Sequence, residues 1–170
     1  MSRWRNGAGR KADIAAGTDW LVGFAWLDAD AAFSDYAGYD RTITLVEGPG
    51  FALDFGLAHP ALLVRRPFVP SAFDGGWPAR CRVADEPCMV LNAMTARAGW
   101  THRLAVVTGS VRAAPAPGGV AFLVVLEGSV TIAGQTAGPR DAFRVEGAVA
   151  IDGVGARVAV IGIDPVTPRA

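Results

Sequence analysis

Short runs of apolar residues, separated by Gly, Pro and Asp, recur along the whole chain and set its expected architecture. Segments of strand length fall at 19–29, 41–48, 51–55, 68–84, 88–97, 101–114, 120–147 and 156–164, and the longer ones hold more than one strand. No stretch keeps a helical apolar period over three turns, so we expect helix only in short pieces, near 28–36. Strands that recur at spacings of about 8–12 residues are typical of a β-sandwich or barrel.

A weak internal repeat refines this picture. The segment TITLVEGPGFALDFG (42–56) resembles FLVVLEGSVTIAGQ (122–135), because each has an apolar strand ending in Glu-Gly, a short turn and a second alternating strand. In the first copy, we predict a hairpin of 41–48 and 51–55. A duplicated β-unit of this kind is typical of the cupin type of jelly roll. The predicted fold class is therefore all-β, with two cupin-like β-barrels of the jelly-roll type fused in one chain and little helix.

The predicted boundary between the two barrels lies near residue 97. We expect 1–97 to form the first cupin-like barrel, with an N-terminal segment at its pocket, and 98–170 to form the second. The Pro-rich segment AAPAPGG (113–119) either belongs to the connection or is an exposed turn within the second barrel. Hydrophobic residues make up 51% of the chain, which is enough for a core of ordinary size.

Charge and hydropathy exclude several classes of partner. Lys and Arg together number 16, as do Asp and Glu, so the net charge is near zero. Proteins that bind nucleic acid or anionic membranes usually carry a basic excess, so neither partner is expected. No apolar run is long enough for a membrane-spanning helix, and the first residues lack the apolar stretch of a signal peptide. We therefore expect a cytoplasmic protein.

The two cysteines are expected to be structural. Cys81 and Cys88 are seven residues apart, which is not a zinc-site spacing. Cys81 stands between Arg80 and Arg82 in a predicted strand, so it would face away from both. We expect reduced, buried thiols rather than a nucleophile.

The familiar motifs of metal, nucleotide and hydrolase sites are missing from the sequence. The only two histidines, His59 and His102, lie in different halves and form no His-x-His pair. There is no Gly-x-Ser-x-Gly, and Asn-Gly-Ala-Gly at 6–9 lacks the Lys-Ser/Thr of a phosphate loop. We therefore predict no metal, no cofactor and no catalytic residue.

Polar residues within apolar strands are the best candidates for a binding site. Asn92 stands between Leu91 and Ala93, and Met94 shares its face of the strand. Burying an amide without partners costs about 1–3 kcal/mol, so Asn92 either bonds to backbone or faces a pocket. Arg82 is similarly placed, just inside a strand.

Arg41, near the start of the strand that leads to Glu47, has two readings. Its guanidinium can clamp a carboxylate with two parallel hydrogen bonds, or it can form a salt bridge with Asp40, Asp74 or a neighbouring residue. Phe68 likewise is either a core or loop anchor or a wall for a ligand. The sequence leaves both questions open.

Four blocks of sequence carry a resemblance to a known family. They are WRNGAGRKADIA (4–15), where the family has a form near W-x-N-G-G-G-x-T-x-E-I-A, then FSDYAGYDRTITLVEG, PFVPSAFDGGWPARC and VLNAMTAR. In order and spacing over about 4–97, the chain resembles the HutD/Ves family of small bicupins. It departs from the family form at Ala8, Lys11 and Asp13, where Gly, Thr and Glu are usual, and at Gly76, where the family has a carboxylate.

The resemblance implies a metal-independent intracellular bicupin with no firmly established catalytic activity. Some members are thought to modulate histidine utilisation, and others are linked to stress response. It implies a regulatory protein that binds a small carboxylate or amide metabolite. The residues expected at the first pocket, with Arg82 added from its strand position, are Trp4, Asn6, Arg41, Phe68, Asp74, Arg82, Asn92 and Met94. The segment that holds Trp4 and Asn6 is expected to fold over the first barrel.

Two alternatives belong to other classes of protein. One is a metal-independent isomerase or lyase on a small organic acid, with Asp74 as base and Arg41 as clamp. The other is a protein-interaction module, which an exposed apolar patch would indicate. The sequence leaves open whether the chain is an enzyme and whether it forms a homodimer.

Overall fold

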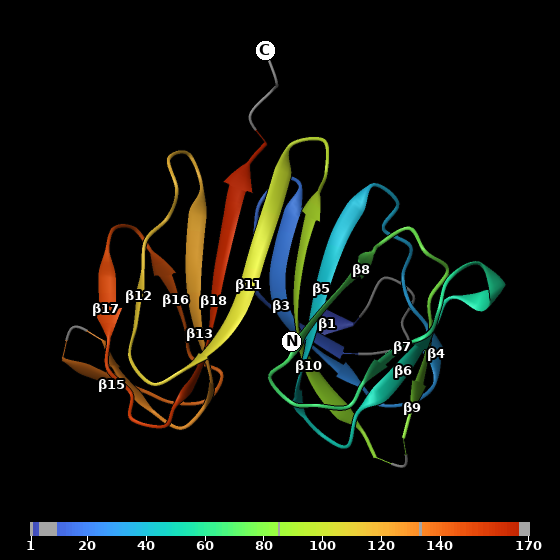
Figure 1. Ribbon diagram of the computed structural model, residues 1–170, viewed down its shortest axis with the longest axis horizontal. Coiled ribbons are helices and arrows are strands. Elements are labelled where there is room, and N and C mark those ends of the chain that lie inside the picture. Colours follow the sequence, from blue (N-terminus) through green and yellow to red (C-terminus); the bar gives the residue numbers. More distant parts are fainter. Residues whose placement is uncertain (1, 4–9, 85, 133, 167–170) are drawn as a thin grey trace. The chain divides into compact units, whose positions relative to one another are not determined.

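The computed structural model describes residues 2–3, 10–84, 86–132 and 134–166. Within these ranges nearly all regular structure is β-strand, and the only helical element is one 3-10 turn, Gly56–Ala58 (Figure 1). This confirms the prediction of an all-β chain with little helix. No helix in the described ranges is long and apolar enough to cross a membrane. The chain divides into two compact units, residues 1–97 and 98–170.

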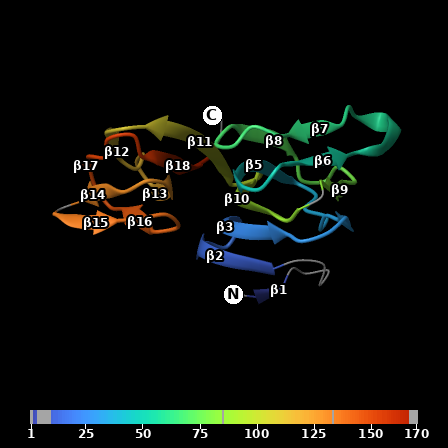
Figure 2. The same ribbon diagram turned by 90° about the horizontal axis from the view of Figure 1, so that it is seen from below.

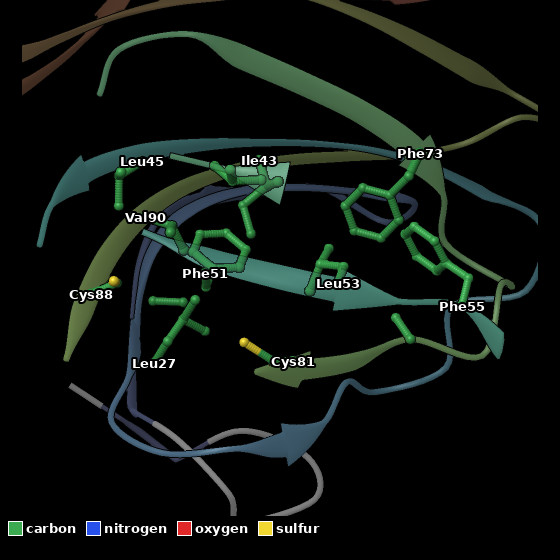
Figure 3. Close-up of a cluster of buried hydrophobic side chains, with 13 residues drawn as sticks. Leu27, Ile43, Leu45, Phe51, Leu53, Phe55, Phe73, Cys81, Cys88 and Val90 are labelled. Atoms are coloured by element: carbon green, nitrogen blue, oxygen red, sulfur yellow. The ribbon is translucent and has the colours of Figure 1, made fainter. Parts of the chain in front are cut away.

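The first unit consists of two antiparallel sheets. The larger contains, in order across the sheet, β1 (Ser2–Arg3), β2 (Arg10–Ala16), β3 (Trp20–Leu27), β10 (Cys88–Ala96), β5 (Tyr39–Glu47) and β8 (Pro70–Asp74). The smaller contains β4 (Ala31–Ala32), β9 (Arg80–Val83), β6 (Phe51–Asp54) and β7 (Leu62–Val64). Figure 2 shows β6 and β7 on the opposite side of this unit from β2 and β3. Buried side chains of both sheets form one cluster, so the sheets pack face to face (Figure 3).

Alternation along β5 and its neighbour β10 decides which side chains enter the space between the sheets. Leu45 pairs with Val90 and Ile43 pairs with Asn92, so these four side chains share a face with Arg41, further along β5. The apolar end of this row packs against side chains of β6 (Figure 3). The polar end, with Arg41 and Asn92, extends past that core and is available to form a site.

The second unit has its own core. One sheet contains β11 (Trp100–Thr108), β18 (Arg157–Pro165), β13 (Val120–Glu127) and β16 (Ala142–Val145). Two strand pairs complete it, β12 (Val111–Ala113) with β17 (Val149–Ile151) and β14 (Val130–Ile132) with β15 (Gln135–Ala137). Leu123, Val125 and Ile151 are among the residues at its buried centre. Every sheet in the described ranges keeps two open edges, so the prediction of two closed barrels is not confirmed.

Two local predictions are wrong. Segments 41–48 and 51–55 do not pair as a hairpin, because β5 lies between β10 and β8 while β6 pairs with β7 and β9. Gly48 and Gly50, with φ of 101° and 105°, turn the chain from one sheet to the other. A Cβ on Gly48 would lie 2.5 Å from the carbonyl oxygen of Pro87, so this close approach needs glycine. Residues 28–36 hold no helix, and there Ala31 pairs with Cys81 in β4 and β9.

The internal repeat has a structural counterpart. The strands β5 and β13 both lie inside their sheets and both end in Glu-Gly with the glycine in the left-handed region, Gly48 and Gly128. Each also carries a register irregularity beside that end. The segment 113–119 connects β12 to β13, so it belongs to the second unit rather than to the connection between units.

Both cysteines are buried, as expected, and this gives a prediction for their reactivity. Cys81 is 0% exposed and Cys88 is 1% exposed, while Arg80 and Arg82 on either side of Cys81 are exposed. Burial, reinforced by Asp30 and by Cys88 itself, raises the pKa of Cys81 to about 12, and burial also raises that of Cys88. Since the thiolate is the reactive form, neither should react with Ellman's reagent in the native protein at mildly alkaline pH. Both should react in denaturant. Titration of one native thiol per chain would contradict this.

Candidate functional site

A cavity opens at the polar end of the inner face of the larger sheet. It encloses about 590 Å³ of empty space, its open mouth included. Strands β2, β3, β5 and β10 and the loop at 33–36 supply its walls. The lining residues are Lys11, Asp13, Leu21, Gly23, Phe24, Ala25, Leu27, Phe33, Ser34, Tyr36, Arg41, Asn92 and Met94. Most are apolar and a few are polar, which is the usual composition of a small-molecule site.

Arg41 is a buried charged residue of the cavity wall, and it is only 7% exposed. Its guanidinium carbon lies 5.0 Å from the ring centre of Phe73, 5.1 Å from Phe33 and 5.4 Å from Tyr36. Aromatic faces attract a cation but accept no conventional hydrogen bond from it. The three rings therefore hold the guanidinium in place and leave its N–H groups for other partners.

The hydrogen-bonding capacity of Arg41 is largely unused. Its Nη2 donates to Oδ1 of Asn92 at 3.3 Å, and its Nε has no partner. No carboxylate of the described residues lies within ion-pair distance of the guanidinium. A buried guanidinium normally has such a partner, so an anion that enters the cavity could pair with Arg41.

Asp40 and Asp74, the two carboxylates considered as partners of Arg41, form ion pairs with Arg97 instead. Nη1 of Arg97 donates to Asp40 at 2.7 Å, and Nη2 donates to Asp74 at 2.9 Å. Asp74 also accepts from the backbone amide of Gly76 at 2.8 Å. The reading of Arg41 as the salt-bridge partner of Asp40 or Asp74 is therefore wrong, because Arg97 neutralises both of them.

Burial lowers the pKa of the Arg41 side chain. The loss of solvation lowers the pKa of Arg41 to about 10, while Tyr36 acts in the opposite direction. At neutral pH the side chain is still a cation. A buried charge without a counter-ion carries a desolvation penalty of several kcal/mol, which a bound anion would offset.

Asn92 and Gly23 shape the floor of the cavity. Asn92 on β10 pairs with Gly23 on β3, and Gly23 pairs in turn with Asp13 on β2. Gly23 lines the cavity between these two residues without a side chain of its own. A Cβ at Gly23 would also lie 2.8 Å from the carbonyl oxygen of Ala12, so the approach of β2 requires glycine there.

An ion pair stands on the β2 wall. Lys11 and Asp13 are two residues apart on one strand, so they share a face. Nζ of Lys11 lies 3.0 and 2.9 Å from the two carboxylate oxygens of Asp13. Side-chain exposure is 30% for Lys11 and 40% for Asp13, so the pair is partly solvated. Their charges cancel, and Arg41 supplies the single remaining positive charge among the residues lining the cavity.

The structure brings together three of the residues predicted for the pocket. Arg41, Asn92 and Met94 line the cavity. Phe68, Asp74 and Arg82 are not among its lining residues. Arg82 is exposed and donates to Asp54 at 3.3 Å, while Phe68 has a φ of 65° and donates its amide to the carbonyl of Leu45.

Two predicted residues, Trp4 and Asn6, lie outside the described residues. The expectation that their segment folds over the first barrel therefore stays a prediction. The following segment, predicted to enter a strand, does so as β2.

Residue-level reasoning missed the two aromatic residues of the 33–36 loop. Phe33 and Tyr36 reach the cavity because their backbone amides donate to the carbonyls of Ala79 and Gly75, which anchors the loop. A signal was present, since two aromatic residues three apart shortly before a strand-borne arginine can stack on that arginine. Lys11 and Asp13 were noted only as departures from the family form.

The histidines and acidic residues form no metal site in the described ranges. No group of three or more His, Cys, Asp or Glu side chains there could hold a metal ion. His59 instead stacks on Trp77, with ring centres 3.9 Å apart and an angle of 12° between planes.

Comparison with known proteins gives consistent results. The HutD family model matches residues 1–159. An uncharacterised 21.2 kDa protein in the hutC 3' region of Pseudomonas putida is 29% identical over 157 residues, which cover 85% of this chain and 80% of that protein. The structure of HutD from Pseudomonas fluorescens SBW25 superposes with a TM-score of 0.80 at 23% identity, covering 97% of this chain and 93% of that one.

A more distant structure shows the fold type. A cupin 2 conserved barrel domain protein from Leptotrichia buccalis has a TM-score of 0.58 at 10% identity, covering 93% of this chain and 89% of that one. At this level of identity the likeness concerns the fold alone, and it is a cupin-like all-β fold.

Proposed function

The chain belongs to the HutD family, and on that premise we propose that it is a small-molecule-binding regulatory protein of histidine utilisation. Its first unit senses a small carboxylate metabolite in the cavity around Arg41. The two units then correspond to the two cupin-like halves of one bicupin. The link to histidine utilisation is supported by the Pseudomonas putida relative, which lies in the hutC 3' region.

One observation carries the choice of ligand class. Arg41 is buried, keeps its charge, has no carboxylate partner among the described residues and leaves its Nε without a hydrogen bond. A carboxylate is the planar acceptor that matches a guanidinium edge, and such pairs are among the strongest hydrogen bonds in proteins. Nη2, which lies beside Nε on the same edge of the guanidinium, donates to Asn92, so this edge is oriented before a ligand arrives.

The geometry favours binding over isomerase or lyase chemistry. Asp74, the base required for that alternative, is held by Arg97 and by the amide of Gly76 and does not line the cavity. The carboxylate that does line it, Asp13, is paired with Lys11. Turnover of a small acid by purified protein, lost in Asp74→Asn, would favour the enzyme instead.

Thermal unfolding in the presence of small acids tests the proposed function. The panel contains urocanate and N-formylglutamate, which are candidates by analogy with histidine degradation, and each acid is paired with its uncharged amide. A ligand at about 100 times its Kd stabilises the native state by about 2.7 kcal/mol, which raises the unfolding midpoint by several degrees. At least one acid with a single carboxylate should raise the midpoint while its amide does not, and N-formylglutamate, which has two carboxylates, shows how many charges the cavity accepts. If no acid raises it, the proposal fails.

Substitution of Asn92 by aspartate should block the site without damaging the fold. Asn92→Asp places a carboxylate where Oδ1 now lies, 3.3 Å from Nη2 of Arg41, and so supplies a permanent counter-ion. A fixed buried pair of this kind is worth about 2 kcal/mol or more, so the affinity for a carboxylate should fall at least about thirtyfold. Calorimetric titration measures the loss. The matched control is Gln135→Glu, on exposed β15 of the second unit, which should bind like wild type.

A further inference from the structure

Building on the proposed function, we infer that the cavity selects acids with a single carboxylate, and that Asp13 excludes acids with two. Lys11 and Asp13 are the other charged residues that line the cavity beside Arg41, and the inference concerns what they add to it. The inference names the class of ligand more narrowly than the presence of Arg41 does.

The charges of the residues that line the cavity match a single carboxylate. Three of them have charged side chains, namely Lys11, Asp13 and Arg41, and the first two neutralise each other through contacts of 2.9 and 3.0 Å. The described wall therefore carries one unpaired positive charge, on Arg41. One carboxylate matches that charge, and a second would enter the cavity without a counter-ion.

An acid held at Arg41 that extends along the cavity has its far end near the Lys11–Asp13 pair. Asp13, Gly23 and Asn92 are directly opposite one another on three adjacent strands. Strands are spaced by about 4.8 Å, so the backbones at Asn92 and Asp13 are about 10 Å apart, and Gly23, which also lines the cavity, lies between them. An acid held by Arg41 and Asn92 that extends across Gly23 brings its other end to the Lys11–Asp13 pair.

The Lys11–Asp13 pair meets a charged ligand group and a neutral one differently. A carboxylate arriving there meets the like charge of Asp13, and it reaches Lys11 only by displacing Asp13 from Nζ. A neutral polar end, such as an amide, a hydroxyl or a ring N–H, can donate to Asp13 without breaking the ion pair. The pair thus disfavours a second negative charge and tolerates a neutral polar group.

Two probes of nearly equal size and shape isolate this effect. Glutarate carries two carboxylates, and glutaramate replaces one of them with a carboxamide. Calorimetric titration at low ionic strength gives the Kd of each, because the pair is partly solvated and salt would screen it. Wild-type protein should bind glutaramate at least tenfold more tightly than glutarate. Asp13→Asn frees Lys11 to meet a second carboxylate, so the ratio of the two affinities should fall at least tenfold, to near one or below.

Two further variants complete the test. Asp28→Asn is the matched control. The side chain of Asp28 is 39% exposed, against 40% for Asp13, and it pairs with Arg10, which lies on β2 as Asp13 does. Asp28 does not line the cavity. It should keep the wild-type ratio within twofold. Lys11→Met leaves Asp13 unneutralised, so both probes should bind more weakly and glutarate should lose more.

The outcomes separate the inference from the proposed function. If wild-type protein binds glutarate as tightly as glutaramate, or if Asp13→Asn and Asp28→Asn give the same ratio, the selectivity inference is overturned while the carboxylate site stands. If wild-type protein binds neither probe, and no acid of the thermal panel raises the midpoint, the proposed function itself is overturned.

Discussion

Arg41→Met is expected to abolish carboxylate binding by the first unit. Methionine fills much of the same space among Phe33, Tyr36 and Phe73 but removes the only unpaired positive charge of the described cavity wall. Loss of a buried charge that pairs with a ligand costs about 2–5 kcal/mol, so affinity should fall at least about thirtyfold and beyond ready detection. Calorimetric titration with the acid that raises the wild-type midpoint measures this.

The same substitution should stabilise the free protein. Burial lowers the pKa of Arg41 to about 10, so the charged form is disfavoured on folding by about 3 kcal/mol at neutral pH. The folded state releases its proton first, so this penalty is fully present below about pH 10 and disappears at higher pH, where the unfolded chain also loses its proton. Removing the charge should raise the free energy of unfolding by about 1–3 kcal/mol in urea titrations.

The control for both effects is Arg103→Met in the second unit. Arg103 is 79% exposed and pairs with Asp164, so its loss should change neither binding nor stability by more than about 0.5 kcal/mol. A variant of Arg41 that binds normally, or that unfolds more readily than wild type, would show that the guanidinium has a structural role instead.

Phe55→Ala should cause a large loss of stability among core substitutions. Phe55 is 2% exposed and its ring lies 5.7 Å from that of Phe73 and 5.1 Å from that of Trp77. Truncating a buried phenylalanine costs about 3–5 kcal/mol, because the surrounding core relaxes only in part. Since Phe73 also packs on Arg41, carboxylate binding should weaken in the molecules that remain folded. Urea unfolding measures the first effect and titration the second.

A neighbouring leucine provides the control for this core prediction. Leu57 lies two residues further on and is fully exposed. Leu57→Ala should change the free energy of unfolding by no more than about 0.5 kcal/mol. Equal losses for the two variants would contradict the packing of Phe55 between the sheets.

Local pattern was sufficient for those parts of the site that depend on one strand. Alternation in the segment 88–97 placed Asn92 and Met94 on one face, and both line the cavity. It also placed Cys81 opposite Arg80 and Arg82, as the structure has it. In each case the periodicity of a regular strand determines the outcome, and the structure of the rest of the chain is not needed.

Pairing between distant segments could not be predicted in the same way. The segment 41–48 lies next to 51–55 in sequence but pairs with 88–96 and 70–74, because Gly48 and Gly50 turn the chain into the other sheet. The same difficulty affected Asp74, whose carboxylate is taken by Arg97 from a distant part of the chain. Only the three-dimensional arrangement shows that Arg41 is left without a counter-ion.

A crystal structure with a bound acid would show whether Arg41 receives a carboxylate at its Nε, as we propose. Crystals should be grown with the acid that gives the largest rise in the unfolding midpoint. We expect a carboxylate oxygen about 2.7–3.2 Å from Nε of Arg41, the atom that now has no hydrogen-bond partner. An acid bound outside this cavity, or bound within it without contact to Arg41, would contradict the proposed carboxylate site.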